Sequence, residues 1–114
     1  MPSSIEGKLI DAAVMSAAKL SDALDCRSVD LGSVQVIWAT ASHADAVLKL
    51  QSSHDGGTTW TDIASASVTL DAVGAGSKVI ELPDITVPAL RANYAKGSNT
   101  TGTVTARYFF KSAK

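Results

Sequence analysis

The amino-acid sequence predicts an all-β fold, an antiparallel β-sandwich of about seven or eight strands. From residue 33 onward, apolar and polar residues alternate with a period of two, which places successive side chains on opposite faces of a sheet. Segments rich in Gly, Pro, Ser and Thr separate these runs at spacings of roughly 8 to 12 residues. A chain of 114 residues suffices for one two-layer core, so we expect a single sandwich domain over residues 1–114.

The Ala-rich N-terminal part of the chain admits two interpretations. Leu9, Ala13 and Leu20 fall near helical spacing, which predicts a helix. The alternative is extended, with an edge strand over residues 9–15 and a second strand over residues 23–29. We prefer the strands on the basis of the family resemblance described below.

The run over residues 33–39 is expected to form a central strand. Val34, Val36 and Trp38 share one face of it. The opposite face, formed by Gln35, Ile37 and Ala39, is also largely apolar, so both faces need cover. The sandwich core covers one face, and a neighbour or a subunit is expected to cover the other.

Residues 47–63 are expected to form a β-hairpin around which the other strands pack. In its first arm, Leu48 and Leu50 point to the core, whereas Lys49 and Gln51 point outward. Downstream, the pattern predicts further strands at residues 66–70, 78–82, 90–94 and 103–110, a Gly-rich loop at residues 71–77, a connection or edge between Pro83 and Pro88, and a polar turn at residues 96–102.

The turn of this hairpin carries the most specific local motif in the sequence. Residues 53–60 fit the S-x-D-x-G-x-T-W form of the Asp-box known from sialidases, through Ser53, Asp55, Gly57 and Trp60. Asp55 is suited to accept backbone hydrogen bonds, and the glycines, Gly56 included, tolerate positive φ. One copy in 114 residues argues against a sialidase, so the motif is interpreted as a structural turn.

The sequence predicts no catalytic residue, no cofactor and no metal site, and therefore a protein that is not an enzyme. His43 and His54 are the only histidines, and neither has further ligands at a diagnostic spacing. Cys26 is the only cysteine, so it is interpreted as a small buried hydrophobe that has no intrachain disulfide partner.

Charge and hydropathy exclude two classes of partner. The formal net charge is -1 and the basic residues are scattered, so nucleic-acid binding is not expected. No apolar run of about 18 residues occurs, which excludes a membrane-spanning helix. Glu6, Lys8 and Asp11 interrupt the N-terminal apolar residues, so no signal peptide is predicted and synthesis in a cytoplasm is expected.

An interface with another protein is predicted on the sheet faces. Phe109 lies on the face opposite its two aromatic neighbours in the last strand, in register with Arg107. The candidate interface residues are Val34, Val36, Tyr94, Arg107 and Phe109. An alternative is a carbohydrate-binding module that contacts host surface glycans, in which Tyr94 and Phe109 would be the outward-facing aromatics.

The order of these segments resembles that of small structural proteins of tailed bacteriophage particles. The resemblance covers about residues 24–114 and rests on Gln35, Trp38, Gln51, Ser53, Asp55, Gly56, Trp60, Thr101, Gly102 and Thr103. The hairpin also resembles that of discoidin-type domains, so a jelly-roll or discoidin-like sandwich is expected. The step Leu24-Asp25-Cys26 partly follows the extended opening of such proteins.

The resemblance implies a virion component made in a bacterial host cytoplasm. Capsid decoration, a vertex spike and attachment to a tail or fibre are the alternatives it leaves open. The implied partners are the protein itself, as a homotrimer or another homo-oligomer, and phage capsid or tail proteins. The resemblance supplies no catalytic residue.

Overall fold

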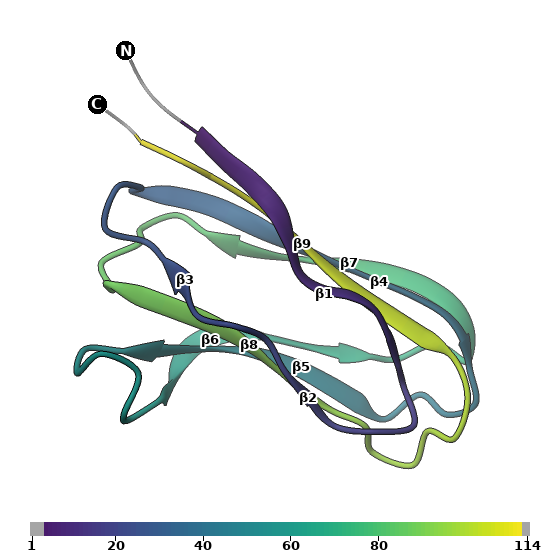
Figure 1. The fold of residues 1–114 in the computed structure, drawn as a ribbon. Coiled ribbons are helices and arrows are strands. Elements are labelled where there is room, and N and C mark those ends of the chain that lie inside the picture. Colours follow the sequence, from purple (N-terminus) through teal and green to yellow (C-terminus); the bar gives the residue numbers. More distant parts are fainter. Residues whose placement is uncertain (1–3, 113–114) are drawn as a thin grey trace.

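Nine β-strands form the fold in the computed structural model, which describes residues 4–112 and contains no helix within them. The strands are β1 (Ser4–Val14), β2 (Lys19–Leu20), β3 (Leu24–Asp25), β4 (Leu31–Ala41), β5 (Ala46–Ser53), β6 (Thr61–Leu70), β7 (Gly74–Leu82), β8 (Ala89–Ala95) and β9 (Thr103–Lys111). Figure 1 shows them as two layers that face each other. The predicted all-β antiparallel sandwich is therefore confirmed.

The strand order is that of a jelly roll. One sheet, here sheet A, has the order β1-β9-β4-β7, and the other, sheet B, has the order β2-β8-β5-β6 with β3 also paired to β8. If β2 and β3 are counted as one interrupted strand, each sheet has four strands and the chain crosses between sheets at every connection except β5–β6. Eight strands wound in this way form a double-sheet jelly roll.

The N-terminal segment is extended, so the helical alternative is wrong and the preferred strand is confirmed. β1 pairs with β9 along its length, from Ser4 opposite Lys111 to Val14 opposite Thr103. The pairing has two register shifts, and Ala12 adopts a φ of 48° within the second. The extended conformation of this segment is therefore set by its pairing with a distant strand. The near-helical spacing of Leu9, Ala13 and Leu20 does not determine it. The predicted strand over residues 23–29 shortens to Leu24–Asp25.

The core lies between the two sheets and is filled by the inward faces of β4, β5, β8 and β9, of which that of β5 is as predicted. The largest fully buried apolar side chains are Tyr94, Phe110, Ile10, Met15, Leu48, Leu50, Leu70, Leu90, Val34, Val36 and Val104. Trp38 is also buried, and its indole nitrogen donates a hydrogen bond of 2.9 Å to the carbonyl oxygen of Ala72.

Two predicted boundaries are wrong. The second arm of the hairpin and the strand at residues 66–70 are one strand, β6, which bends at Ser65, where φ is 63°. The predicted Gly-rich loop at residues 71–77 is loop only up to residue 73, because β7 begins at Gly74. A glycine is needed at position 76, since a Cβ there would overlap the Trp38 ring.

The connection between the two prolines is as predicted, since no strand forms between Leu82 and Ala89. It is nevertheless tied to the body of the protein. Ile85 is buried, and its backbone nitrogen donates a hydrogen bond of 2.7 Å to the carbonyl oxygen of Asp30. Within residues 4–112, no helix is long and apolar enough to cross a membrane.

Candidate interaction surface

The outward face of sheet A carries the exposed side chains in rows that run across the strands. Antiparallel pairing places partnered residues side by side on one face of a sheet. The first row, running from β1 to β7, is Glu6, Phe109, Ser33 and Glu81. Phe109 is 44% exposed and is the only aromatic in the row. An apolar ring therefore lies among acidic and hydroxyl groups.

The second row is basic where the first is acidic. It consists of Lys8, Arg107, Gln35 and Val79. Lys8 lies directly opposite Arg107, and its ammonium group also contacts the carboxylate of Asp11 at 3.2 Å. Like charges at directly opposite positions destabilise a strand pair. Arg107 has no acidic partner among the described residues.

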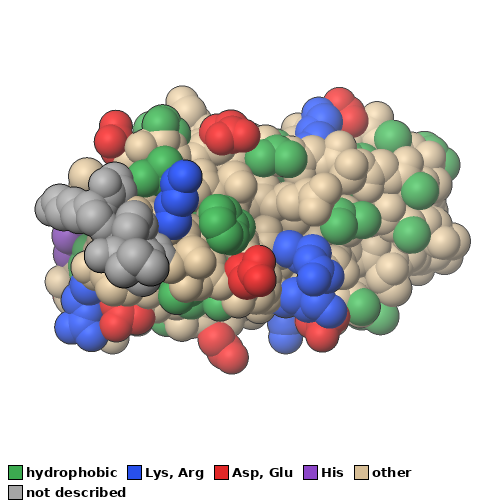
Figure 2. Space-filling model, turned by 90° about the horizontal axis from the view of Figure 1, so that it is seen from above, with side chains coloured by type: hydrophobic (Ala, Val, Ile, Leu, Met, Phe, Trp, Pro, Cys, Tyr) green, Lys and Arg blue, Asp and Glu red, His purple; other side chains and the backbone are tan. Residues whose placement is uncertain are grey.

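A shallow hollow of about 370 Å³ opens between the two rows. Both rows contribute to its lining, through Glu6, Phe109, Ser33, Arg107 and Gln35. Figure 2 views the molecule from this side, and on the coloured part of the face hydrophobic side chains are interspersed with basic and acidic ones. The expectation that this face is largely apolar is therefore wrong, because Gln35 and Arg107 occupy its centre.

Three of the five predicted interface residues lie elsewhere. Val34, Val36 and Tyr94 are fully buried in the core, because their strands turn these side chains toward the opposite sheet. The Tyr94 hydroxyl donates a hydrogen bond of 3.0 Å to the carbonyl oxygen of Met15, and burial raises the pKa of Tyr94. These residues are not available to a partner of the folded chain. Only Arg107 and Phe109 lie on an outer surface.

The interpretation of the sequence missed most of the residues that share the surface with Arg107 and Phe109. Val79 and Glu81 belong to a predicted strand, but its place beside β4 was not predicted. Glu6 and Lys8 were missed, because only the pairing of β1 with β9 brings them to this face. No local pattern in the sequence indicates which residues of β1 oppose which residues of β9.

The Asp-box turn is held by hydrogen bonds to one carboxylate. Asp55 accepts bonds from the backbone nitrogen of Thr59 at 2.8 Å and from the hydroxyl of Ser53 at 2.9 Å. The Ser53 hydroxyl in turn accepts a bond from the nitrogen of Gly57 at 2.9 Å. Because these bonds, first of all those from Thr59, favour the ionised form, they lower the pKa of Asp55 to about 2. The turn is therefore held in shape by hydrogen bonds among its own residues.

A polar network extends from this turn over the outward face of sheet B. The Arg91 guanidinium lies 4.5 Å from the centre of the Trp60 ring, and its Nε donates a bond of 2.9 Å to Gln51. Gln51 donates a bond of 2.8 Å to Asp62, which also pairs with Lys49 at 3.1 Å. Gln51 points outward as predicted, but this network buries it. The hydrogen-bonding groups of this network are thus paired with one another.

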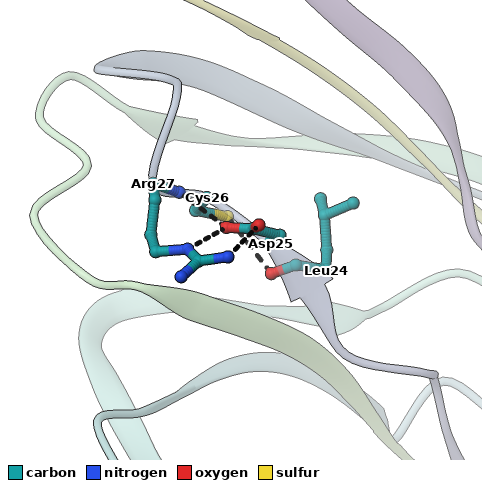
Figure 3. Close-up of polar contacts among 4 residues, drawn as sticks. All are labelled: Leu24, Asp25, Cys26 and Arg27. Carbon is teal, nitrogen blue, oxygen red and sulfur yellow. Dashed lines mark hydrogen bonds and ion pairs between the residues drawn. The ribbon is translucent and has the colours of Figure 1, made fainter. Parts of the chain in front are cut away.

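Figure 3 shows β3 and the two residues that follow it. Arg27 folds back on Asp25, with its terminal nitrogen 2.8 Å from the carboxylate, and this side-chain bond together with one from the Arg27 backbone lowers the pKa of Asp25 to about 2. The neighbouring Cys26 is buried, and desolvation raises the pKa of its thiol to about 11. Its thiol lies 3.6 Å from the carbonyl oxygen of Leu24. A thiol that is both buried and protonated is a poor nucleophile.

The two histidines lie in separate loops. His43 is fixed through its backbone nitrogen, which donates to the Asn99 side chain at 3.0 Å, and its ring contacts the hydroxyl of Ser42 at 3.0 Å. His54 is exposed in the Asp-box turn. Among residues 4–112, no group of three or more His, Cys, Asp or Glu side chains is placed to hold a metal ion.

The sequence matches no family model and no curated protein sequence, but the structure resembles solved structures. The SPBc2 prophage-derived protein YomS superposes with a TM-score of 0.62 at 10% sequence identity, covering 98% of this chain and 96% of that chain. A Bacillus endospore appendage protein, from a family of disulfide-linked pili, gives a TM-score of 0.53 at 11% identity and covers 100% of this chain and 87% of that one.

A third similar structure is that of infectious bursal disease virus, Gx strain. It gives a TM-score of 0.51 at 9% identity, and the match covers 97% of this chain but 32% of that chain. What the three share with this chain is the fold. At these identities the likeness supports the β-sandwich and carries no residue of a site from one protein to another.

Proposed function

We propose that this chain is a non-enzymatic structural protein of a bacteriophage particle, which self-assembles and attaches to the capsid or tail. The main support is a fold shared almost end to end with a prophage-derived protein of the same size, at 98% and 96% coverage of the two chains. The jelly-roll winding is also common in viral capsid domains. Two of the three similar structures come from assembled particles or filaments.

The proposal places function on a sheet face. The outward face of sheet A presents an exposed phenyl ring beside Glu6 and Arg107, which form no ion pair among the described residues, and aromatic rings and arginines are enriched in protein interfaces. Arg107 and Phe109 are the two predicted interface residues that remain on this surface.

The alternative of a module that contacts host glycans is placed second. It was based on two outward-facing aromatics, and Tyr94 is buried in the core. Phe109 alone provides a small platform for a sugar ring, and its neighbours on the same row include the acidic Glu6.

The proposal is tested by binding of the purified protein to particles. Particles from the strain that carries the gene, with the gene deleted, are mixed with the labelled protein and sedimented. We expect saturable co-sedimentation with a fixed number of copies per particle. An unrelated β-sandwich of similar size and charge serves as the control. Co-sedimentation no greater than that of the control would contradict the proposal.

A further inference from the structure

We propose that the outward face of sheet A pairs with the same face of a second copy of the chain, about a two-fold axis. The inference deepens the proposed function, since it rests on self-assembly and names the surface and the partner. It is carried by the two rows defined above, the acidic row with Glu6 and Phe109 and the basic row with Lys8 and Arg107.

Each row carries charge that the chain itself does not neutralise. Lys8 and Arg107 lie opposite each other on adjacent strands, and only Lys8 has an acidic contact, to Asp11. Glu6, one row away, is exposed and forms no ion pair within the described residues. A partner that placed acidic groups opposite the basic row and basic groups opposite the acidic row would neutralise the charge of both rows.

A second copy supplies part of this arrangement by symmetry, since it brings acid to base on β1 and a ring to the Arg107 guanidinium on β9. A two-fold axis that runs parallel to the sheet just outside its outward face, crosses the strands and passes between the rows places each row over the other row of the second copy. Residues of the same strand then face each other, so Glu6 faces the partner's Lys8. Phe109 faces the partner's Arg107, a pair that can form a cation–π contact. Ser33 faces the partner's Gln35, which can form a hydrogen bond.

The mixed character of the face favours a second copy over other occupants. A partner with one sign of charge would match one row and oppose the other. An apolar partner would bury Arg107 and Glu6 without compensation, which is costly. The hollow between the rows offers room for the partner's side chains to interdigitate, since both rows line it.

The size of the face predicts a weak pair. Four strands spaced by about 4.8 Å and two rows spaced by about 6.8 Å give roughly 19 by 14 Å. The buried area would be about 550 Å² in total, which is below the roughly 1,200 Å² of stable complexes. We therefore expect dissociation constants of roughly 10 μM to 1 mM for the free protein. On a particle, many copies held close together would raise the effective concentration.

The test uses opposite charge swaps at the one salt-bridge contact that the symmetry predicts. Glu6→Lys alone places a second ammonium group over the partner's Lys8, and Lys8→Glu alone places two acids together. Because each contact occurs twice in a two-fold dimer, each variant should weaken self-association at least about tenfold, measured by sedimentation equilibrium up to about 1 mM. An equimolar mixture of the two variants restores both contacts, so a heterodimer about as tight as the wild-type pair is expected.

A control variant, a check of folding and a particle-binding measurement accompany this test. Lys96→Glu reverses an exposed charge in the loop after β8 and should leave association unchanged. Circular dichroism checks that each variant folds. A wild-type chain that stays monomeric at about 1 mM, or a mixture that associates no better than either variant alone, would overturn the proposal. Loss of particle binding by both variants and by their mixture would assign the face to a particle protein instead of a second copy.

This inference and the proposed function fail separately. Particle binding that survives in both charge-swap variants, combined with no pairing in solution, removes the two-fold pair and leaves the structural role. Restored pairing in the mixture, combined with no binding of the wild-type chain to particles, removes the structural role and leaves the two-fold pair.

Discussion

At the residue scale, single polar groups fix the loops that end the strands. Asp55 gathers the Asp-box turn by accepting bonds from Ser53 and Thr59. At the other end of the sandwich, Asp45 accepts two bonds from the backbone nitrogen of Ser98, at 3.0 and 3.1 Å, which lower its pKa. Carboxylates of this kind act on stability through their ionised form, so their contribution depends on pH.

Asp55→Asn should lower the melting temperature at neutral pH but not in strong acid. The folded pKa of Asp55 is about 2, below its ordinary value of 3.8. A depressed folded pKa stabilises the fold above the unfolded pKa, and this stabilisation is lost as the pH falls from about 4 to about 2. Melting curves of wild type and variant, recorded from pH 7 to pH 2, should therefore converge in acid. Asp22→Asn, at an exposed aspartate, is the control. A difference that does not change with pH would contradict this role.

Tyr94→Phe should destabilise the protein by about 1–2 kcal/mol, because it leaves the buried Met15 carbonyl without its side-chain donor. Urea denaturation measures the change. Tyr108→Phe is the control, because Tyr108 is also partly buried in the sandwich. Its hydroxyl forms no hydrogen bond among residues 4–112. Equal effects of the two substitutions would show that the Met15 bond contributes nothing.

At the element scale, β7 and β4 are joined by a contact between a ring and a backbone. Trp38 lies opposite Gly76, and its ring occupies the space that a side chain at position 76 would take. The Trp38 indole also reaches the carbonyl oxygen of Ala72. One tryptophan thus fixes the start of an edge strand that has only one neighbouring strand in its sheet.

Gly76→Ala should destabilise the protein by about 1–3 kcal/mol, because the Trp38 ring must move from its buried position. Thermal melting measures the loss of stability, and Trp fluorescence reports the movement of the Trp38 ring. Ala75→Ser, at the exposed neighbouring position, should change stability by less than about 0.5 kcal/mol. A fully stable Gly76→Ala variant with unchanged fluorescence would contradict the packing described here.

The elements that the sequence predicted well are those in which period-two alternation meets a buried face. The inward residues of β5 follow directly from that alternation, whereas Val34 and Val36 of β4 were correctly placed on one face but assigned to an interface instead of the core. The start of β7 at Gly74 could not be predicted in this way, because glycines in a sequence usually indicate a loop. Only the structure shows that the Trp38 ring packs on Gly76. For the candidate surface, Phe109 and Arg107 were accessible from their own strand. Glu6 and Lys8 were not, since their place depends on a pairing across about 100 residues.

At the scale of the whole molecule, the sandwich presents two different outward faces. On sheet B the polar groups from Lys49 to Arg91 are bonded to one another. On sheet A, Glu6, Arg107 and Phe109 form no such network within the described residues. β1 forms one edge of sheet A and pairs with β9, so the start of β1 lies beside the end of β9 (Figure 1). The polar groups of sheet B satisfy one another, and the face of sheet A is the one that we propose takes part in assembly.

The structural role is tested most directly by quantitative mass spectrometry of native particles. Particles produced by the strain that encodes the chain are purified on a density gradient, and peptides of this protein are counted against those of the major capsid protein. The account predicts a constant copy number in every particle fraction, a multiple that fits the symmetry of the capsid, vertex or tail. A protein abundant in the lysate but absent from the particle fractions would contradict it.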